Sequence, residues 1–395
     1  MVATGTRVKA GLVIAAALVL AGCSGGGLTP IGATTTSSKP AAPAAKLTGA
    51  PVDGTKGVTV NTPVTLTADG GTIKDVALVD GAGKAVAGKP GADGKTWSST
   101  GQLDFGQTYT YDAKALNADG KPTNLHGSFS TVAPGTLVRG MLNIDDGGEV
   151  GVAAPIVLQF SGHIDDKARA AVEKALSVQS DQPNTGSWGW LPDSDQGSRI
   201  HYRTKEYWAP GSKINVTANL YGVSYGGNAY GKADLTLAFT IGRSQIVRAD
   251  VNTHKMTVLR DGKEVATYDA SMGSGASQDR VTRSGTHVVT EKWQDKDMSN
   301  PPYYEHAHER WAVRISNNGE FIHANPNTVG DQGNSNVTHG CINLSTADAQ
   351  AYFGTAMYGD PVEVTGSDVA LSSADGDLYD WAMGWDQWQA LSALR

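Results

Sequence analysis

The sequence predicts a mainly β protein, with two β-sandwich modules, a mostly-β third domain with one short helix, and a C-terminal helical extension. Glycine is abundant, with 49 copies among 395 residues, and short runs rich in Val and Thr recur between Asp-Gly pairs. Such composition is typical of strands joined by tight turns, because β-branched residues favour strands and Asp-Gly favours two-residue hairpins. A chain of this length allows about two to four domains.

The N-terminus has the pattern of an export signal. Arg7 and Lys9 precede an apolar run over 11–21, which ends at Leu20-Ala21-Gly22-Cys23. This tetrapeptide resembles the bacterial lipobox, which implies cleavage before Cys23 and lipid attachment to its thiol. We expect a lipoprotein signal peptide at 1–22 and a disordered tether at 23–46, poor in apolar residues. The protein would be exported and lipid-anchored to the outer face of the plasma membrane, facing the cell wall. An ordinary secretory signal with a chance cysteine is the alternative.

Residues 47–134 and 135–243 are predicted to form the two sandwich modules. Asp-Gly turns separate the strand-like runs of the first, and Ser128–Thr131 is echoed by Ala238–Ile241 in the second. The second module would then be a diverged copy, although two independent β modules remain an alternative. A helix is expected over 165–176, where apolar residues recur every four positions. Neither module contains a catalytic cluster, so both are interpreted as spacers or docking surfaces.

Residues 244–366 are predicted to form the third domain. Asp261-Gly262 marks one hairpin and Asn317-Asn318-Gly319 a second. A helix is expected to begin after Ser345, a candidate N-cap, and a closing strand is expected over 362–364. In the extension, 367–395, Leu378, Trp381, Trp385 and Trp388 are spaced to share one face of a helix. We expect this helix to dock on the third domain or on its junction with the second module.

Charge and cysteine content narrow the functional classes. The net charge is −7, and nucleic acid is excluded as the main partner because phosphate binding needs clustered Lys and Arg. The two cysteines, Cys23 and Cys341, allow at most one disulfide. If Cys23 is lipidated, Cys341 is a lone thiol in an exported protein. Such a thiol is unusual and indicates a chemical role for Cys341.

Candidate catalytic residues are concentrated around that thiol, in Thr338-His339-Gly340-Cys341-Ile342-Asn343. In an extended segment, His339, Cys341 and Asn343 share one face. Gly340 leaves room for a substrate carbonyl beside the thiol. A nucleophilic cysteine needs a base to form the thiolate, and both His339 and the more distant His323 are candidates.

These residues resemble the signature of the L,D-transpeptidase catalytic domain, in which a His is followed, after a spacer, by Ser/Thr-His-Gly-Cys-hydrophobic-Asn. Nearly the whole mature chain, and most specifically about 244–366, resembles the multidomain L,D-transpeptidases of mycobacteria and related actinobacteria, which implies two immunoglobulin-like modules before the catalytic domain. Ala324 follows His323, where a mycobacterial relative has Ser. With Ala at this position, the His323 imidazole stays properly oriented only if the backbone carbonyl of residue 324 holds it. If the serine hydroxyl is needed, activity would drop.

The resemblance implies a role for each matching residue. Cys341 would be the nucleophile, His323 the general base, and His339 a support for the thiolate. The backbone N–H groups of Gly340 and Cys341, with Tyr304 or, as second choice, Tyr303, would stabilise the oxyanion. Thr338 and Asn343 would hold the site by hydrogen bonds. Met272 would line the substrate.

The resemblance also implies the reaction. Cys341 would attack a tetrapeptide stem of peptidoglycan, release D-Ala and form a thioester, which an amine of a neighbouring stem would convert to a 3→3 cross-link. Carbapenems would acylate the same thiol, and no cofactor is expected. An L,D-carboxypeptidase that transfers the acyl group to water, and an inactive structural lipoprotein, are the alternatives. A zinc site at His306, His308, His323, His339 and Cys341 is a further, disfavoured interpretation.

Overall fold

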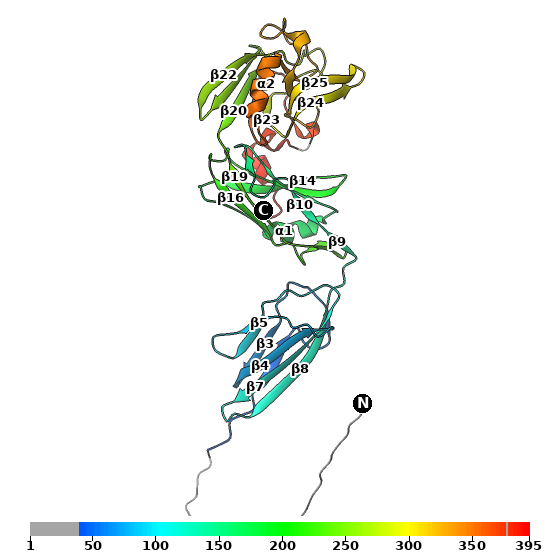
Figure 1. Ribbon diagram of the computed structural model, residues 1–395. Coiled ribbons are helices and arrows are strands. Elements are labelled where there is room, and N and C mark those ends of the chain that lie inside the picture. Colours follow the sequence, from blue (N-terminus) through cyan, green and yellow to red (C-terminus); the bar gives the residue numbers. More distant parts are fainter. Residues whose placement is uncertain (1–38, 377) are drawn as a thin grey trace, which may run out of the picture. The chain divides into compact units, whose positions relative to one another are not determined.

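The computed structural model describes residues 39–376 and 378–395, and residues 44–395 form one compact unit. The expected signal peptide, Cys23 and most of the expected tether lie outside the described residues. Within the described ranges, no helix is long and apolar enough to cross a membrane. The chain is mostly β, as predicted, with few helices (Figure 1).

The first module is a sandwich of two four-stranded sheets. One has the order β1 (Lys46–Ala50), β3 (Thr65–Asp69), β6 (Thr96–Ser99), β5 (Gly88–Pro90), and the other β2 (Thr55–Val58), β8 (Pro122–Thr131), β7 (Thr108–Asn117), β4 (Gly71–Asp80). Alternate residues of β7 and of the second half of β8 are buried in one core, which contains Leu66, Trp97 and Tyr109.

The second module also packs two four-stranded sheets on one core, which contains Phe160, Trp190 and Trp208. Their orders are β10 (Gly140–Leu142), β12 (Ile156–Phe160), β15 (Gly197–Thr204), β14 (Gly186–Ser194), and β11 (Glu149–Val150), β19 (Leu235–Ile241), β16 (Lys213–Ala218), β13 (Leu176–Ser180). A small sheet adds β17 (Ser224–Gly226), β18 (Ala229–Gly231) and β9 (Thr136–Val138). Helix α1 (Asp166–Lys174) is shorter than predicted, because Leu176 already begins β13.

The two sandwiches share an unusual pairing that supports the predicted repeat. In the first module, β2 runs parallel to β8, which is antiparallel to β7. In the second, β11 runs parallel to β19, which is antiparallel to β16. The echoed segments Ser128–Thr131 and Ala238–Ile241 therefore occupy equivalent strands.

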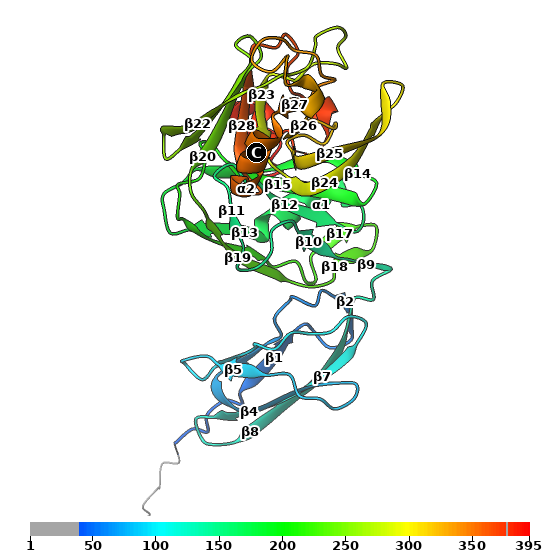
Figure 2. The same ribbon diagram turned by 45° about the horizontal axis from the view of Figure 1, so that its top comes forward.

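The third domain packs two sheets around a core of its own (Figure 2). The first sheet has the order β22 (Lys263–Asp269), β21 (Lys255–Arg260), β20 (Gln245–Asp250), β28 (Pro361–Thr365), β23 (Gly285–Val288). The second has the order β24 (Glu291–Asn300), β25 (Tyr304–Arg314), β26 (Phe321–Ala324), β27 (Ile342–Leu344), and α2 (Thr346–Thr355) packs against β25 and β26.

Local sequence signals in this domain act as predicted. Asp261 and Gly262 take positive φ angles of 50° and 76°, which a tight hairpin between β21 and β22 requires. The Ser345 side chain accepts a hydrogen bond from the Asp348 N–H and caps α2. The expected closing strand is β28, which pairs with β20 and β23.

A buried ion pair joins the two ends of the third domain. Arg243, just before β20, contacts both carboxylate oxygens of the completely buried Asp360 at 2.8 Å, and Gln245 donates to the same carboxylate. Next to it, the N–H groups of Gly151 and Ala153 in the second module donate to the carbonyls of Tyr358 and Gly359. An added Cβ at Gly151 would lie 2.4 Å from the backbone of Asp360, so glycine permits this close approach.

The C-terminal extension departs from the prediction of one amphipathic helix. It contains η2 (Ser373–Asp375), η3 (Asp380–Ala382) and the short helix α3 (Trp385–Gln389). Met383 and Gly384 are extended and interrupt the helical path. The three tryptophans converge instead on the guanidinium of Arg203 in the second module, which lies 4.7–5.3 Å from the rings of Trp381, Trp385 and Trp388.

Polar contacts fix the extension on the second module. His201 Nδ1 lies 2.8 Å from the Asp380 carboxylate, and both side chains are buried. The Trp388 indole N–H donates to the Ser187 carbonyl, and buried Glu173 accepts from Ser392 and from the Ala393 N–H. The extension was expected to dock on the third domain or on its junction with the second module, and these contacts place it on the second module itself.

Replacement of Trp388 by Ala should destabilise the protein. The indole is completely buried, so Trp388→Ala should lower the free energy of unfolding by about 3–5 kcal/mol. The matched control is Leu394→Ala in the same extension, where the side chain is 48% exposed and the change should stay within about 0.5 kcal/mol. Urea denaturation measures both, and equal midpoints for the two variants would contradict the packing role of Trp388.

Candidate active site

The parallel pairing of β26 and β27 brings the distant halves of the motif together. Ile322 pairs with Ile342, His323 with Asn343, and Ala324 with Leu344. Ile322 and Ile342 are completely buried in the core. Since side chains alternate across a sheet, His323 and Asn343 point to the opposite face, as does Cys341 two residues before Asn343. The sequence-predicted residues His339, Cys341 and Asn343 all line one cavity at this face.

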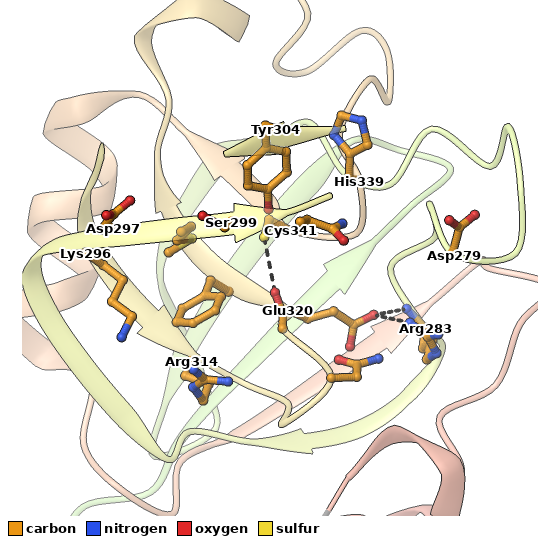
Figure 3. Close-up of a pocket in the computed structure, with 15 residues that line it drawn as sticks. Asp279, Arg283, Lys296, Asp297, Ser299, Tyr304, Arg314, Glu320, His339 and Cys341 are labelled. Carbon is orange, nitrogen blue, oxygen red and sulfur yellow. Dashed lines mark hydrogen bonds and ion pairs between the residues drawn. The ribbon is translucent and has the colours of Figure 1, made fainter. Parts of the chain in front are cut away.

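Cys341 is a free thiol at the floor of a cleft and is 8% exposed. Its Sγ donates a weak hydrogen bond to the Gly319 carbonyl at 3.7 Å, in the turn between β25 and β26. Tyr304, at the start of β25, points its hydroxyl toward the thiol (Figure 3). Cys341 thus lies between the turn and the β24–β25 hairpin.

Thr338 and Gly340 shape the turn that presents the thiol. The Thr338 hydroxyl donates to the Cys341 carbonyl at 2.6 Å and accepts from the Gly340 N–H at 3.2 Å. Gly340 has a φ of +125°, and an added Cβ would lie 3.0 Å from the Val281 carbonyl oxygen. The positive φ and the nearby Val281 carbonyl therefore both require glycine here, in addition to any need for space beside a substrate. Because the Gly340 N–H is already bonded to Thr338, its expected part in an oxyanion hole is not supported.

His323 is buried and lines the same cavity as the thiol. Its Nδ1 lies 3.0 Å from the Ala324 carbonyl oxygen and 3.1 Å from Oε2 of Glu309. Burial lowers the pKa of His323, but hydrogen bonds to Cys341 and Glu309 and the negative charges of both outweigh burial and raise it. Of the two candidate bases that the sequence left open, His323 is the one whose surroundings favour the protonated ring. The Ala324 carbonyl reaches the ring, so the missing hydroxyl at this position does not leave the imidazole unheld.

His339 packs against two aromatic rings. Its ring centroid is 4.7 Å from that of Tyr303 and 5.6 Å from that of Tyr304. Burial and the nearby Arg280 charge lower the pKa of His339, so the ring is neutral at pH 7. A neutral ring can shape the cleft, but it offers no positive charge to a thiolate.

The two candidate tyrosines occupy different positions. Tyr304 lines both cavities beside Cys341, and burial, with the charges of Cys341 and Glu309, raises the pKa of its hydroxyl to about 12. Its hydroxyl therefore keeps its proton and remains a donor. Tyr303 is 39% exposed and donates to Asp279 at 2.7 Å. Of the two, Tyr304 is placed to meet an oxyanion at the thiol.

The structure corrects the expectation for Met272. This side chain is completely buried in the core of the third domain and lines neither cavity, so it cannot contact substrate. Its backbone belongs to the segment that bridges to Thr338 and Asn343. Met298, on β24, takes the place at the cleft and lines both cavities. Sequence reasoning missed Met298, although Tyr304, which packs against the same small cluster, was a candidate.

Two cavities meet at Cys341. The first has a volume of about 390 Å³ and carries charges of both signs, from Asp279, Arg283, Lys296, Asp297, Arg314 and Glu320 (Figure 3). The second has a volume of about 270 Å³ and holds Glu309, His323, Asn325, Thr328 and Asn343. Cys341, His339, Tyr304 and Met298 line both. The thiol can therefore be approached from two directions.

Asn343 presents a polar group at the second cavity. Its side-chain N–H donates to the Thr328 hydroxyl at 3.4 Å, while its buried Oδ1 has no partner among the described residues.

His306 and His308, which were considered as zinc ligands, are exposed on β25, where His306 pairs with Asp297. Among the described residues, no group of three or more His, Cys, Asp or Glu is arranged to hold a metal ion.

Known proteins match this chain over both its β modules and its third domain. Residues 55–224 match the family described as a bacterial Ig domain, and residues 244–364 match the L,D-transpeptidase catalytic domain. L,D-transpeptidase 5 of Mycobacterium tuberculosis is 49% identical over 89% of this chain and 78% of its own length. The chain belongs to the L,D-transpeptidase family.

Other L,D-transpeptidases are similar as well. L,D-transpeptidase 2 of M. tuberculosis is 35% identical over 88% of this chain and 85% of its own length. The solved structure of the L,D-transpeptidase LdtMt1 in complex with imipenem is 29% identical, covers 59% of this chain and 99% of that one, and superposes with a TM-score of 0.48. The family resemblance drawn from the motif is confirmed, and so is the order of an Ig-like region before the catalytic domain.

Replacement of Gly340 by Ala should damage this L,D-transpeptidase. A positive φ and the Val281 contact each oppose a side chain, so Gly340→Ala should lower stability by about 1–3 kcal/mol. The matched control is Gly354→Ala in α2, where an added Cβ meets nothing within 4 Å and should stabilise the helix by about 0.5–1 kcal/mol. Opposite shifts in melting temperature are expected, and a stable Gly340→Ala variant would contradict the backbone constraint.

The pKa values of the two histidines beside the thiol should differ from the ordinary value of about 6.5 in opposite directions. His339 should lose its proton below that pH, whereas His323 should keep its proton above it. NMR titration of the imidazole protons measures both, with His323→Gln and His339→Gln variants to assign the signals. If both rings titrate together near the ordinary value, the assignment of His323 as the ion-paired base is wrong.

Proposed function

We propose that this L,D-transpeptidase cross-links peptidoglycan through a thioester on Cys341, with a tetrapeptide stem as acyl donor and release of D-Ala. The observation that carries the proposal is that a free, nearly buried thiol and buried His323 line one cavity, where the Ala324 carbonyl and Glu309 hold the imidazole through Nδ1. Such a pair supplies an activated cysteine nucleophile at neutral pH.

In the acylation step, His323 takes the proton of the Cys341 thiol and the thiolate attacks the carbonyl of the third stem residue. The Tyr304 hydroxyl and the Cys341 backbone N–H are the candidate donors to the oxyanion. When the tetrahedral intermediate collapses, the bond to D-Ala breaks and the leaving amine takes the proton from His323. A thioester to Cys341 remains.

In the transfer step, an amine of a second stem gives a proton to His323 and attacks the thioester carbonyl. The carbon–sulfur bond breaks, the Cys341 sulfur leaves, and it recovers the proton from the imidazolium. Two cavities that meet at the thiol support this proposal, because donor and acceptor need separate approaches to one sulfur atom.

The cellular setting and the inhibitors are part of the same proposal. A lipid on Cys23 would hold the enzyme at the outer face of the plasma membrane, with peptidoglycan within reach of its tether and modules. A carbapenem offers a strained acyl group to the same thiolate, and LdtMt1 has been solved in complex with imipenem. We therefore expect Cys341 to form a carbapenem adduct.

Incubation with a disaccharide-tetrapeptide tests the reaction, with products measured by mass spectrometry. Dimers with loss of D-Ala are expected, whereas tripeptide alone would show that the enzyme is an L,D-carboxypeptidase. Cys341→Ala should abolish turnover and the carbapenem adduct in an intact-mass measurement. Turnover retained by Cys341→Ala would refute the thioester mechanism.

A further inference from the structure

A carboxylate not expected from the sequence lies against the proposed base. Glu309 Oε2 is 3.1 Å from Nδ1 of His323, and the Glu309 side chain is 19% exposed while that of His323 is 5% exposed. Glu309 lines the second cavity together with His323. An ion pair this shielded from water is screened much less than a surface pair.

A bulge in β25 aims Glu309 at His323. Val313 pairs with Ile322, but the register shifts by one residue before Arg310, which pairs with Ala324. Without this shift, the alternation of side chains would turn Arg310 toward the face of His323 and Glu309 away from it. Trp311, inside the bulge, has a φ of +56°, a conformation that a bulky side chain rarely adopts. Bulges of this kind re-aim side chains beside active sites.

We propose that Glu309 is a positioning residue for the proposed cysteine chemistry. Glu309 holds His323 through Nδ1 and stabilises the imidazolium form of His323 beside the Cys341 thiolate. This role rests on the function proposed above. The step is a transfer of the thiol proton from Cys341 Sγ to Nε2 of His323, while Nδ1 keeps its proton and Glu309 stays a carboxylate.

The hydrogen-bond partners fix the tautomer without reference to any titration. A backbone carbonyl and a carboxylate can only accept, so Nδ1 of His323 must carry a hydrogen toward Ala324 and Glu309. The nitrogen left to meet the thiol is Nε2, which in the neutral ring holds a lone pair. The Ala324 carbonyl alone would orient the ring, but it carries no net charge. Glu309 adds the charge that an imidazolium needs in a buried site.

The other groups around His323 do not replace this charge. Cys341 supplies a negative charge once it is a thiolate, Tyr304 keeps its proton, and His339 is neutral. Lys296 lies opposite Glu309 on β24, but its ammonium group stacks over the Trp293 ring at 4.1 Å. Glu309 is therefore free to pair with the imidazolium.

The decisive experiment measures the nucleophile and the base without any peptidoglycan substrate. Alkylation of Cys341 by iodoacetamide and the NMR titration of His323 are followed across pH in wild type, Glu309→Gln and Glu305→Gln. In Glu309→Gln, we expect His323 to lose its proton at a lower pH than in wild type. Alkylation at neutral pH should slow by about tenfold, which is less than the full rate contribution of a general acid–base group. Glu305 is exposed on the same strand, so Glu305→Gln should match wild type.

Further variants keep the test decisive. Glu309→Asp retains the charge and should lie between wild type and Glu309→Gln in both measurements, which a purely structural role would not produce. Glu309→Ala replaces Glu309→Gln if the latter does not fold. An unchanged His323 titration and alkylation rate in the folded variant would overturn the positioning role. If these shifts occur but the wild type produces no cross-linked dimer, the role of Glu309 stands and the transpeptidase proposal fails.

Discussion

The parallel pairing of β26 with β27 is the constraint on which the site depends. It places His323 beside Asn343 and fixes Cys341 on the same face, while Ile322 and Ile342 anchor the opposite face in the core. A slip of one residue would bury polar side chains in the core and expose Ile342 in the cleft, so the hydrophobic pattern sets the register. The crossover between the strands also supplies Thr338 and Gly340, which shape the approach to the thiol.

The parts of this structure that sequence could predict are those with local causes. The Asp261-Gly262 hairpin and the Ser345 cap each depend on a few adjacent residues, and both are present. The tryptophans of the extension were predicted to share a helix, yet a buried arginine of another module determines where they lie. Glu309 could not be predicted from the sequence for a related reason. Its direction depends on a bulge at Trp311, and periodicity alone would have turned it away from His323.

The C-terminal extension is also connected to the cleft through charged contacts. Arg283 lies 2.5 Å from the Asp375 carboxylate of the extension and also donates to buried Glu320. Burial raises the pKa of Glu320, so its charged form depends on Arg283 and on His287 3.5 Å away. Glu320 follows Gly319, whose carbonyl accepts from the Cys341 thiol. The extension therefore supports the turn that contacts the Cys341 thiol, and it also docks on the second module.

The two histidines of the motif are separated in charge by their surroundings. His339 packs on Tyr303 and Tyr304 and faces Arg280, which together favour a neutral ring. His323 lies between a thiol and a carboxylate, and only the anions beside it offset the burial that would otherwise remove its proton. A buried imidazolium without such partners would be costly, because burial disfavours any charged form. With a thiolate at Cys341, the imidazolium of His323 would lie between two anions, and the loss of either anion would remove part of the charge that favours its protonated form.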